Sequence, residues 1–173
     1  MCKCNAFQQN TYKLLTFSFL QVMMSLRQIG VLGIYVMLAY VIENKRSNQL
    51  RRIGEVSLGI YLMSYVYLIN NVSQYRNAFF AHMLGGDYMR YLIAITLAGC
   101  ALSFFSGFFL RDMSLCAAVT LALTVGFVDL DLKYWMSLGI HQWSQIRQIL
   151  NSTCTVVGFL FLFFTMDNRL KAE

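Results

Sequence analysis

The sequence has little charge and no proline. Only 13% of its 173 residues are charged, while 58% are hydrophobic; ordinary soluble domains carry about 25% charged residues. Half the usual charge, combined with several long apolar runs, argues against a soluble domain and places the chain among polytopic membrane proteins. The expected fold class is therefore all-α, a helical membrane bundle in which residues 1–173 form a single transmembrane domain.

The net charge does not indicate a nucleic-acid-binding protein. The formal charge is +6, but the sequence offers no soluble domain that could display a basic patch to a nucleic acid. The basic residues stand beside the apolar runs, where they set membrane topology and contact lipid headgroups. The lipid bilayer is thus an expected partner, and nucleic acid is not.

Motifs for common chemistries are also lacking. The chain has no Gly-rich phosphate loop, no nucleophile-elbow serine and no cluster with zinc-ligand spacing. Three of its five cysteines lie within apolar runs, where a thiol behaves as a small hydrophobe. Cys2 and Cys4 form a lone Cys-x-Cys pair without a second ligand pair. We expect no metal and no permanently bound cofactor, and the polar start, Met1 to Asn10, predicts no removable signal peptide.

A series of apolar runs dominates what is present. About 20 helical residues are needed to cross roughly 30 Å of hydrocarbon. Runs close to that length predict about five transmembrane helices, near residues 26–42, 53–70, 91–110, 113–130 and 149–166. Residues 14–24 are expected to be interfacial or re-entrant, because a single helix through both of the first two segments would be long for an untilted span.

The connecting segments differ in a way that predicts their sides of the membrane. Residues 43–52 form the densest basic loop, which the positive-inside rule places in the cytoplasm. Residues 70–87 and 131–147 are rich in aromatic side chains, so we expect both on the outer face, the first as a short interfacial helix. Arg111-Asp112 forms a short charged turn between two spans, which predicts an antiparallel helical hairpin.

Polar side chains within the second span are candidates for substrate binding. Glu55 lies one turn inside its cytoplasmic end, where a preceding arginine can pair with it at helical spacing. Ser57, Tyr61 and Ser64 follow at spacings near three and four residues and so share a helix face. This stripe either lines a path for a polar substrate or packs against a neighbouring helix.

The two histidines are candidate catalytic bases. His82 and His141 both fall in the outer connectors, and histidine is the usual general base near neutral pH. If the connectors meet, one histidine with Asp87, Asp129 or Asp131 would form an acid–base pair. The alternative is that both are solvated loop residues.

One stretch of the second span resembles a known family. Ile53 to Leu62 reads Ile-Gly-Glu-Val-Ser-Leu-Gly-Ile-Tyr-Leu and is similar to a late transmembrane helix of the acyltransferase-3 family. Its members are bacterial-type integral membrane enzymes that transfer acetyl or other acyl groups to sugars of cell-surface polysaccharides. The resemblance extends, with less specificity, over residues 29–111, a C-terminal portion of such an enzyme. Ser64 stands where the family tends to have histidine, and the family's N-terminal helices have no counterpart here.

The resemblance implies an O-acyltransferase of the bacterial inner (plasma) membrane that uses acyl-CoA as donor and is truncated or partner-dependent. Glu55, Ser57, Tyr61 and Ser64 would then line the donor or glycan path. The alternative, from a different class, is a non-catalytic small membrane protein that binds a larger membrane partner as an accessory or exclusion factor, or that self-associates. A small transporter or channel subunit is disfavoured, because few charged groups are expected at mid-membrane.

Overall fold

The computed structural model describes residues 25, 28–41, 48–83, 85–137 and 141–170, except the side chains of 167–170. All regular structure within these residues is helical, which confirms the expected fold class. An apolar helix, Gln28–Val41, comes first. The elements that follow are α2 (Asn48–Asn71), α3 (Ser73–His82), α4 (Gly86–Ser106), α5 (Leu110–Thr124), the π-helix η1 (Val125–Asp129), α6 (Leu132–Ser137) and α7 (Gln142–Leu170).

Four of these helical segments are long and apolar enough to cross a membrane: α2, α4, α5 continued by η1, and α7 as far as Met166. They correspond to the last four predicted spans, and they make the chain an integral membrane protein. The predicted span at residues 26–42 contains the apolar helix Gln28–Val41, whose described part is about 21 Å long. The segment expected at 14–24 lies outside the described residues.

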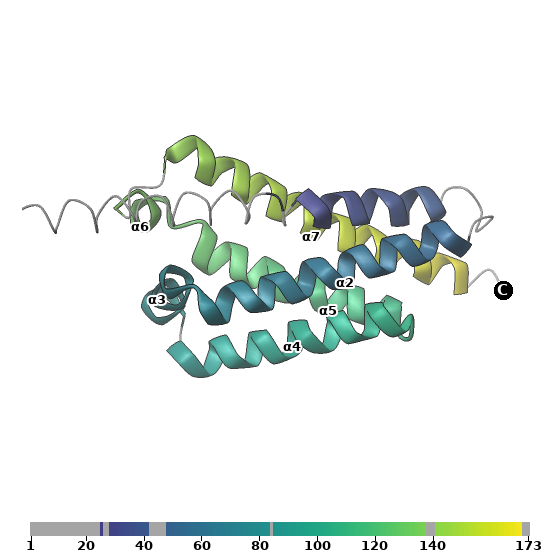
Figure 1. The fold of residues 1–173 in the computed structure, drawn as a ribbon, viewed down its shortest axis with the longest axis horizontal. Coiled ribbons are helices and arrows are strands. Elements are labelled where there is room, and N and C mark those ends of the chain that lie inside the picture. Colours follow the sequence, from purple (N-terminus) through teal and green to yellow (C-terminus); the bar gives the residue numbers. More distant parts are fainter. Residues whose placement is uncertain (1–24, 26–27, 42–47, 84, 138–140, 171–173) are drawn as a thin grey trace, which may run out of the picture.

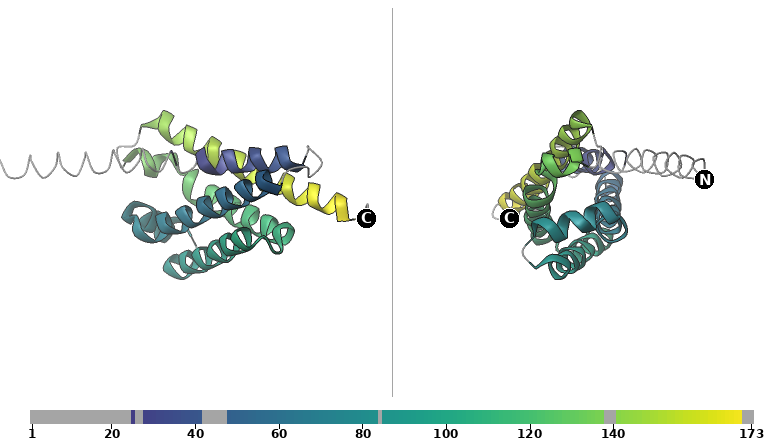
Figure 2. Two further views of the ribbon diagram at one scale, coloured as in Figure 1. Left: turned by 45° about the vertical axis from the view of Figure 1, so that its right-hand side comes forward. Right: turned by 90° about the vertical axis from the view of Figure 1, so that its left-hand side faces the viewer.

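The long helices lie side by side along the long axis of the molecule, and α3 and α6 cross one end of it (Figure 1). Viewed down that axis, the helices form a ring (Figure 2). α2 packs against α4, α4 against α5, and α5 against α7. The end of the bundle opposite α3 and α6, where α2 begins and α4 ends, is called the basic end below.

Small residues let the Gln28–Val41 helix lie close to two other helices. A Cβ atom built at Gly30 would lie 2.6 Å from the ring of Tyr61 in α2, and one built at Gly158 in α7 would overlap Ile34. Close backbone approach through glycine is typical of helix contacts in membranes, where packing replaces the hydrophobic effect as the main attraction. These contacts hold the shorter helix against α2 and α7.

The predicted hairpin between the third and fourth spans is present, but its turn lies earlier than expected. Gly107 ends α4 in the left-handed region at φ 78°, and its N–H donates to the Ser103 carbonyl at 2.9 Å. α5 then starts at Leu110, so Arg111 and Asp112 belong to its first turn. Glycine takes this conformation at little cost, and a carboxylate is favourable at a helix N-terminus.

The aromatic connectors are largely helical. The first contains α3, as expected. The second contains α6 and the beginning of α7, which starts at Gln142, before the predicted span at 149.

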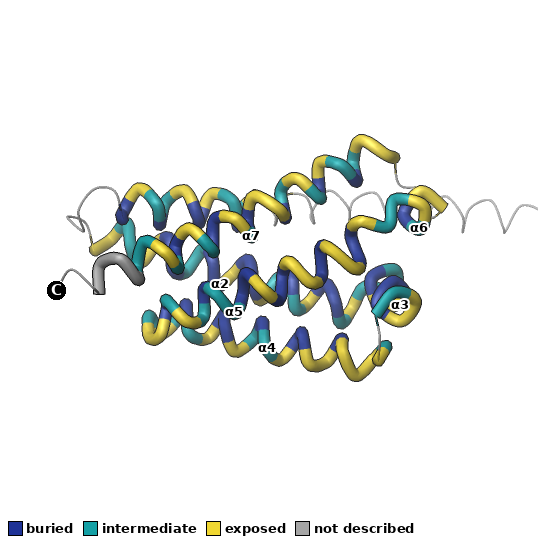
Figure 3. The backbone as a smooth tube through the Cα atoms, turned by 180° about the vertical axis from the view of Figure 1, so that it is seen from behind, coloured by how far each residue is buried: buried dark blue, intermediate teal, exposed yellow. Residues whose placement is uncertain are grey.

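Outward faces of the bundle are apolar. Along α4, Leu92, Ile95 and Leu102 are 58–72% exposed, whereas Leu97 is fully buried. The burial pattern alternates around each long helix, with buried residues turned toward the bundle axis (Figure 3). In water such a surface would drive aggregation, but in hydrocarbon it carries no such cost.

Candidate functional site

The structure brings one predicted histidine and one predicted aspartate together. His82, the last residue of α3, places its Nε2 atom 2.6 Å from Oδ2 of Asp131, which precedes α6. Its Nδ1 atom lies 3.0 Å from the Ala78 carbonyl oxygen. Both ring nitrogens therefore face oxygen acceptors, and only a doubly protonated imidazolium donates to both. Of the three aspartates considered from the sequence, Asp131 is the partner of His82.

Asp131 also caps helix α6. Its Oδ1 atom accepts a hydrogen bond from the Tyr134 backbone N–H at 3.1 Å, the arrangement of an N-cap aspartate. This backbone bond, followed by the hydrogen bond and charge of His82, holds the pKa of Asp131 below its usual range. The Asp131 carboxylate thus caps the N-terminus of α6 and links α6 to α3 through His82.

Replacing Asp131 with asparagine tests this pair by its pH dependence. Since the folded-state pKa is lowered, the ionised carboxylate stabilises the fold above the unfolded pKa of about 3.9. That contribution disappears as the pH falls through the lower folded-state pKa. The stability advantage of the parent over D131N, measured by circular dichroism in mild detergent, should therefore be full near neutrality and vanish in acid.

Asp112→Asn is the control for this measurement. Asp112 is exposed in the first turn of α5, and its replacement should change stability by less than about 1 kcal/mol, the range for a carboxylate at an exposed helix N-terminus. An advantage of the parent over D131N that grew toward acid would contradict the assignment.

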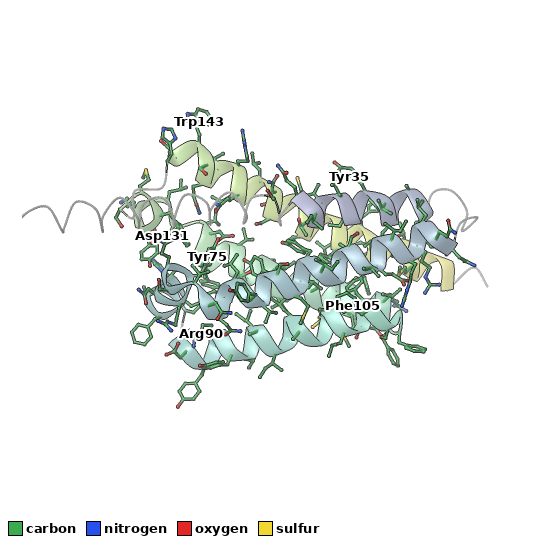
Figure 4. The ribbon with its side chains drawn as sticks, in the orientation of Figure 1. Tyr35, Tyr75, Arg90, Phe105, Asp131 and Trp143 are labelled. Atoms are coloured by element: carbon green, nitrogen blue, oxygen red, sulfur yellow. The ribbon has the colours of Figure 1, made fainter. Side chains whose placement is uncertain are left out.

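Next to this pair lies a buried aromatic and polar cluster around η1. Trp135 of α6 donates its indole N–H to the Val128 carbonyl at 2.9 Å, and its ring centroid lies 4.8 Å from that of Tyr75 in α3. Tyr75 and Asp131 occupy the same end of the bundle (Figure 4). The π-helix is closed by the bond from Leu130 N–H to the Val125 carbonyl, and a local π-segment alters which carbonyls are left to other donors.

Asp129, which ends η1, is fully buried in this cluster. The Tyr75 hydroxyl lies 3.5 Å from its Oδ1 atom, and Gln145 of α7 donates from Nε2 to its carbonyl oxygen at 3.1 Å. Asp129 thus joins η1 to α3 and α7. Buried ionisable groups in membrane helices are expensive and usually face the bundle interior, as this one does.

A buried polar stripe on α7 was not anticipated from the sequence. Gln145, Gln148, Ser152 and Thr155 are all at most 4% exposed. Their spacings of three and four residues place them on one helix face. The same spacing is present in the sequence. The stripe was missed because the predicted span began at residue 149, whereas α7 begins at Gln142.

The residues of the stripe predicted on α2 make separate packing contacts. Tyr61 is 2% exposed and packs on Gly30, and Ser57 faces Gly33. Ser64 donates its hydroxyl to the Ile60 carbonyl of its own helix at 2.8 Å. These contacts match the packing alternative, and a substrate role for Ser57, Tyr61 and Ser64 stays a prediction.

Glu55 pairs with both preceding arginines, as its position predicts. Its carboxylate lies 2.6 Å from Arg51 Nε and 3.4 Å from Arg52 Nη1, and its side chain is 2% exposed. The arginine side chains are 43% and 59% exposed. A buried carboxylate therefore holds two accessible guanidinium groups at the basic end.

His141 lies apart from His82 and acts at the start of α7. Its Nδ1 atom accepts from the Trp143 N–H at 3.4 Å, and its carbonyl accepts from Ser144 N–H at 2.9 Å. Trp143 projects outward there (Figure 4). Nothing described joins the two histidines into one site, and a catalytic role for either stays a prediction.

The α7 groove and the basic hollow are two hollows of the described surface, and their described lining residues include no histidine. The α7 groove, about 440 Å³, is apolar, and its lining includes Ile34, Tyr35, Thr153, Cys154, Val157 and Gly158. The basic hollow, about 460 Å³, is polar, and its lining includes Asn48, Arg51, Arg52, Glu55, Gly107 and Phe108. Within the described parts of the chain, no three His, Cys, Asp or Glu side chains could together hold a metal ion.

Comparison with models of known protein families shows to which family the chain belongs. The model of the TMEM101 protein family matches residues 5–166, nearly the whole sequence. The chain belongs to the TMEM101 protein family. No solved structure matches it.

Membership in the TMEM101 family overturns the resemblance to acyltransferase-3 enzymes. That resemblance rested on ten residues, and the fold explains several of them by packing. Gly59 faces Phe105 of α4, where a Cβ atom would lie 2.7 Å from the ring, and Gly54 faces Met37. Small residues and tyrosine are common at helix contacts in any membrane bundle, so such a motif arises without shared ancestry. The expectations of acyl-CoA as donor and of a bacterial inner membrane followed from the resemblance alone and have no independent support.

Proposed function

We propose that this TMEM101-family chain is a non-catalytic membrane protein that binds a transmembrane helix of a larger membrane partner. The α7 groove is the binding surface, and its position on the least covered spanning helix carries the proposal. A third of the most apolar stretch of α7 is buried, against 39% in α4 and half in α2 and in α5 with η1.

The composition of the groove favours a helix over an acyl chain as its occupant. Thr153 and Cys154 are the small residues that line the groove, since Gly158 already packs against Ile34 of the Gln28–Val41 helix. Thr153 and Cys154 are exposed near the middle of the span. Small and hydroxyl-bearing residues are enriched at helix interfaces, because they allow close backbone approach and bonds across the contact.

The positions of the candidate catalytic groups also support a binding role. His82 is held by Asp131 and the Ala78 carbonyl, and it fastens α3 to α6. A general base must lie within hydrogen-bond reach of a substrate proton. Neither histidine is among the residues that line the α7 groove or the basic hollow.

Site-specific photo-crosslinking in intact cells tests the proposal. A photoreactive side chain at Val157, which is 57% exposed in the groove, should yield one discrete adduct with a larger membrane protein. The same group at Ile95, 72% exposed on α4, is the matched control and should yield no such adduct. The adduct at Val157 should disappear when Gly158→Leu is added, because the added side chain alters the groove.

Three results would contradict the proposal. An adduct with twice the mass of the chain would show that a second copy occupies the groove. Adducts with lipid alone would show an acyl chain there, and equal adducts at Val157 and Ile95 would show no preferred face.

A further inference from the structure

The basic hollow has the geometry of an anion site. A Cβ atom built at Gly107 would lie 3.5 Å from Glu55 Oε2, 3.8 Å from Arg52 Nη1 and 3.9 Å from Arg51 Nη2. Two guanidinium groups and a carboxylate therefore converge within 4 Å of one point. Because Gly107 has no side chain, that point is open. The charged groups therefore line a hollow of about 460 Å³.

The charges around the hollow do not balance. Among the described residues, two arginines and one glutamate line it, with a net charge of +1. Glu55 is buried and contacts Nε of one arginine and Nη1 of the other. Arg51 also hydrogen-bonds Tyr40. Because each guanidinium carries five donors in a fixed fork, these contacts still leave several donors for a bound anion. Arginine forks match phosphate oxygens in pairs, which makes phosphate the fitting anion.

Neighbouring aromatic side chains place the hollow at headgroup depth. Phe108 and Phe109, in the turn between α4 and α5, are 70% and 73% exposed. Phe108 also lines the hollow. Exposed phenyl rings at the end of two spanning helices favour the region just below the lipid headgroups. The positive-inside rule predicts that this end is cytoplasmic, and anionic lipids concentrate in that leaflet.

We propose that the basic hollow binds the phosphate of an anionic phospholipid in the cytoplasmic leaflet, with Arg51 and Arg52 as donors. This site is separate from the α7 groove and lies on different helices. It does not depend on the partner-binding function.

Competition binding to the purified full-length chain in mild detergent tests the site. A fluorescent phosphatidic acid, whose phosphate is exposed, is displaced by unlabelled phosphatidic acid, phosphatidylcholine or inorganic phosphate. Phosphatidic acid should compete strongly, whereas phosphatidylcholine should not, because its choline group neutralises the phosphate. Inorganic phosphate should compete weakly, because it lacks the acyl chains that Phe108 and Phe109 would contact.

Variants with opposite expected effects complete the test. R51Q should weaken binding by about 5-fold and R51Q/R52Q by about 30-fold, as expected from the contribution of each basic residue near a membrane surface. Glu55→Gln should retain or tighten binding, because it removes the competing negative charge. Arg76→Gln is the charge-matched control, because Arg76 is exposed on α3 at the opposite end, and this variant should bind as the parent does.

The outcomes separate the alternatives. Equal affinity of R51Q/R52Q and the parent, or an equal loss in R76Q, would overturn the site in favour of general charge attraction. Inorganic phosphate competing as well as the lipid would identify a soluble phosphate as the ligand and overturn the lipid proposal. If R51Q/R52Q does not fold, E55Q decides, since weaker binding by that variant contradicts the proposal.

Discussion

Replacing Trp135 with alanine should lower the free energy of unfolding by about 3–5 kcal/mol. Trp135 is 1% exposed, so its removal leaves a large cavity. The change also removes the donor to the Val128 carbonyl in η1 and the ring that contacts Tyr75 and Tyr134. α3, α6 and η1 should loosen together, because this one side chain touches all three.

Trp143→Ala is the matched control for this prediction. Trp143 is 73% exposed and projects from the start of α7, so its replacement should change stability by less than about 0.5 kcal/mol. Stability is measured by loss of the helical circular dichroism signal in increasing denaturing detergent. Equal effects of the two substitutions would show that Trp135 does not organise this end of the bundle.

Gly158→Leu should destabilise the bundle by about 2–3 kcal/mol. Any side chain at this position overlaps Ile34, so the Gln28–Val41 helix must move away from α7. The loss should exceed any gain in helix propensity, which is about 1 kcal/mol for replacing glycine in a helix. The same displacement would change the α7 groove and weaken partner binding.

Gly99→Leu makes the same chemical change where no collision follows. Gly99 lies on an exposed face of α4, and nothing stands within 4 Å of a Cβ atom built there. This variant should be as stable as the parent or slightly more stable. Unfolding in mixed detergent micelles compares the two variants, and equal stability of G158L and the parent would contradict the close packing at Ile34.

The low charge and the long apolar runs of the sequence explain why the spans were predictable. Hydropathy is a local sum over about 20 residues, so low charge and long apolar runs suffice to predict membrane helices. The last four predicted spans therefore lie within α2, α4, α5 with η1, and α7, apart from a few residues at their ends. The Glu55 pair was predictable for the same reason, because its partners lie three and four residues away on one helix.

The candidate sites depend on contacts between helices, which a hydropathy profile does not predict. The sequence by itself determined a helical membrane protein with a basic end, and it narrowed the partner of a histidine to three aspartates. Only the tertiary structure selected Asp131 for His82, across 49 residues, and buried Asp129 at the end of a π-helix. The reason is physical: transfer into lipid depends on the side chains of one helix, whereas a pairing depends on how several helices rotate and pack against one another.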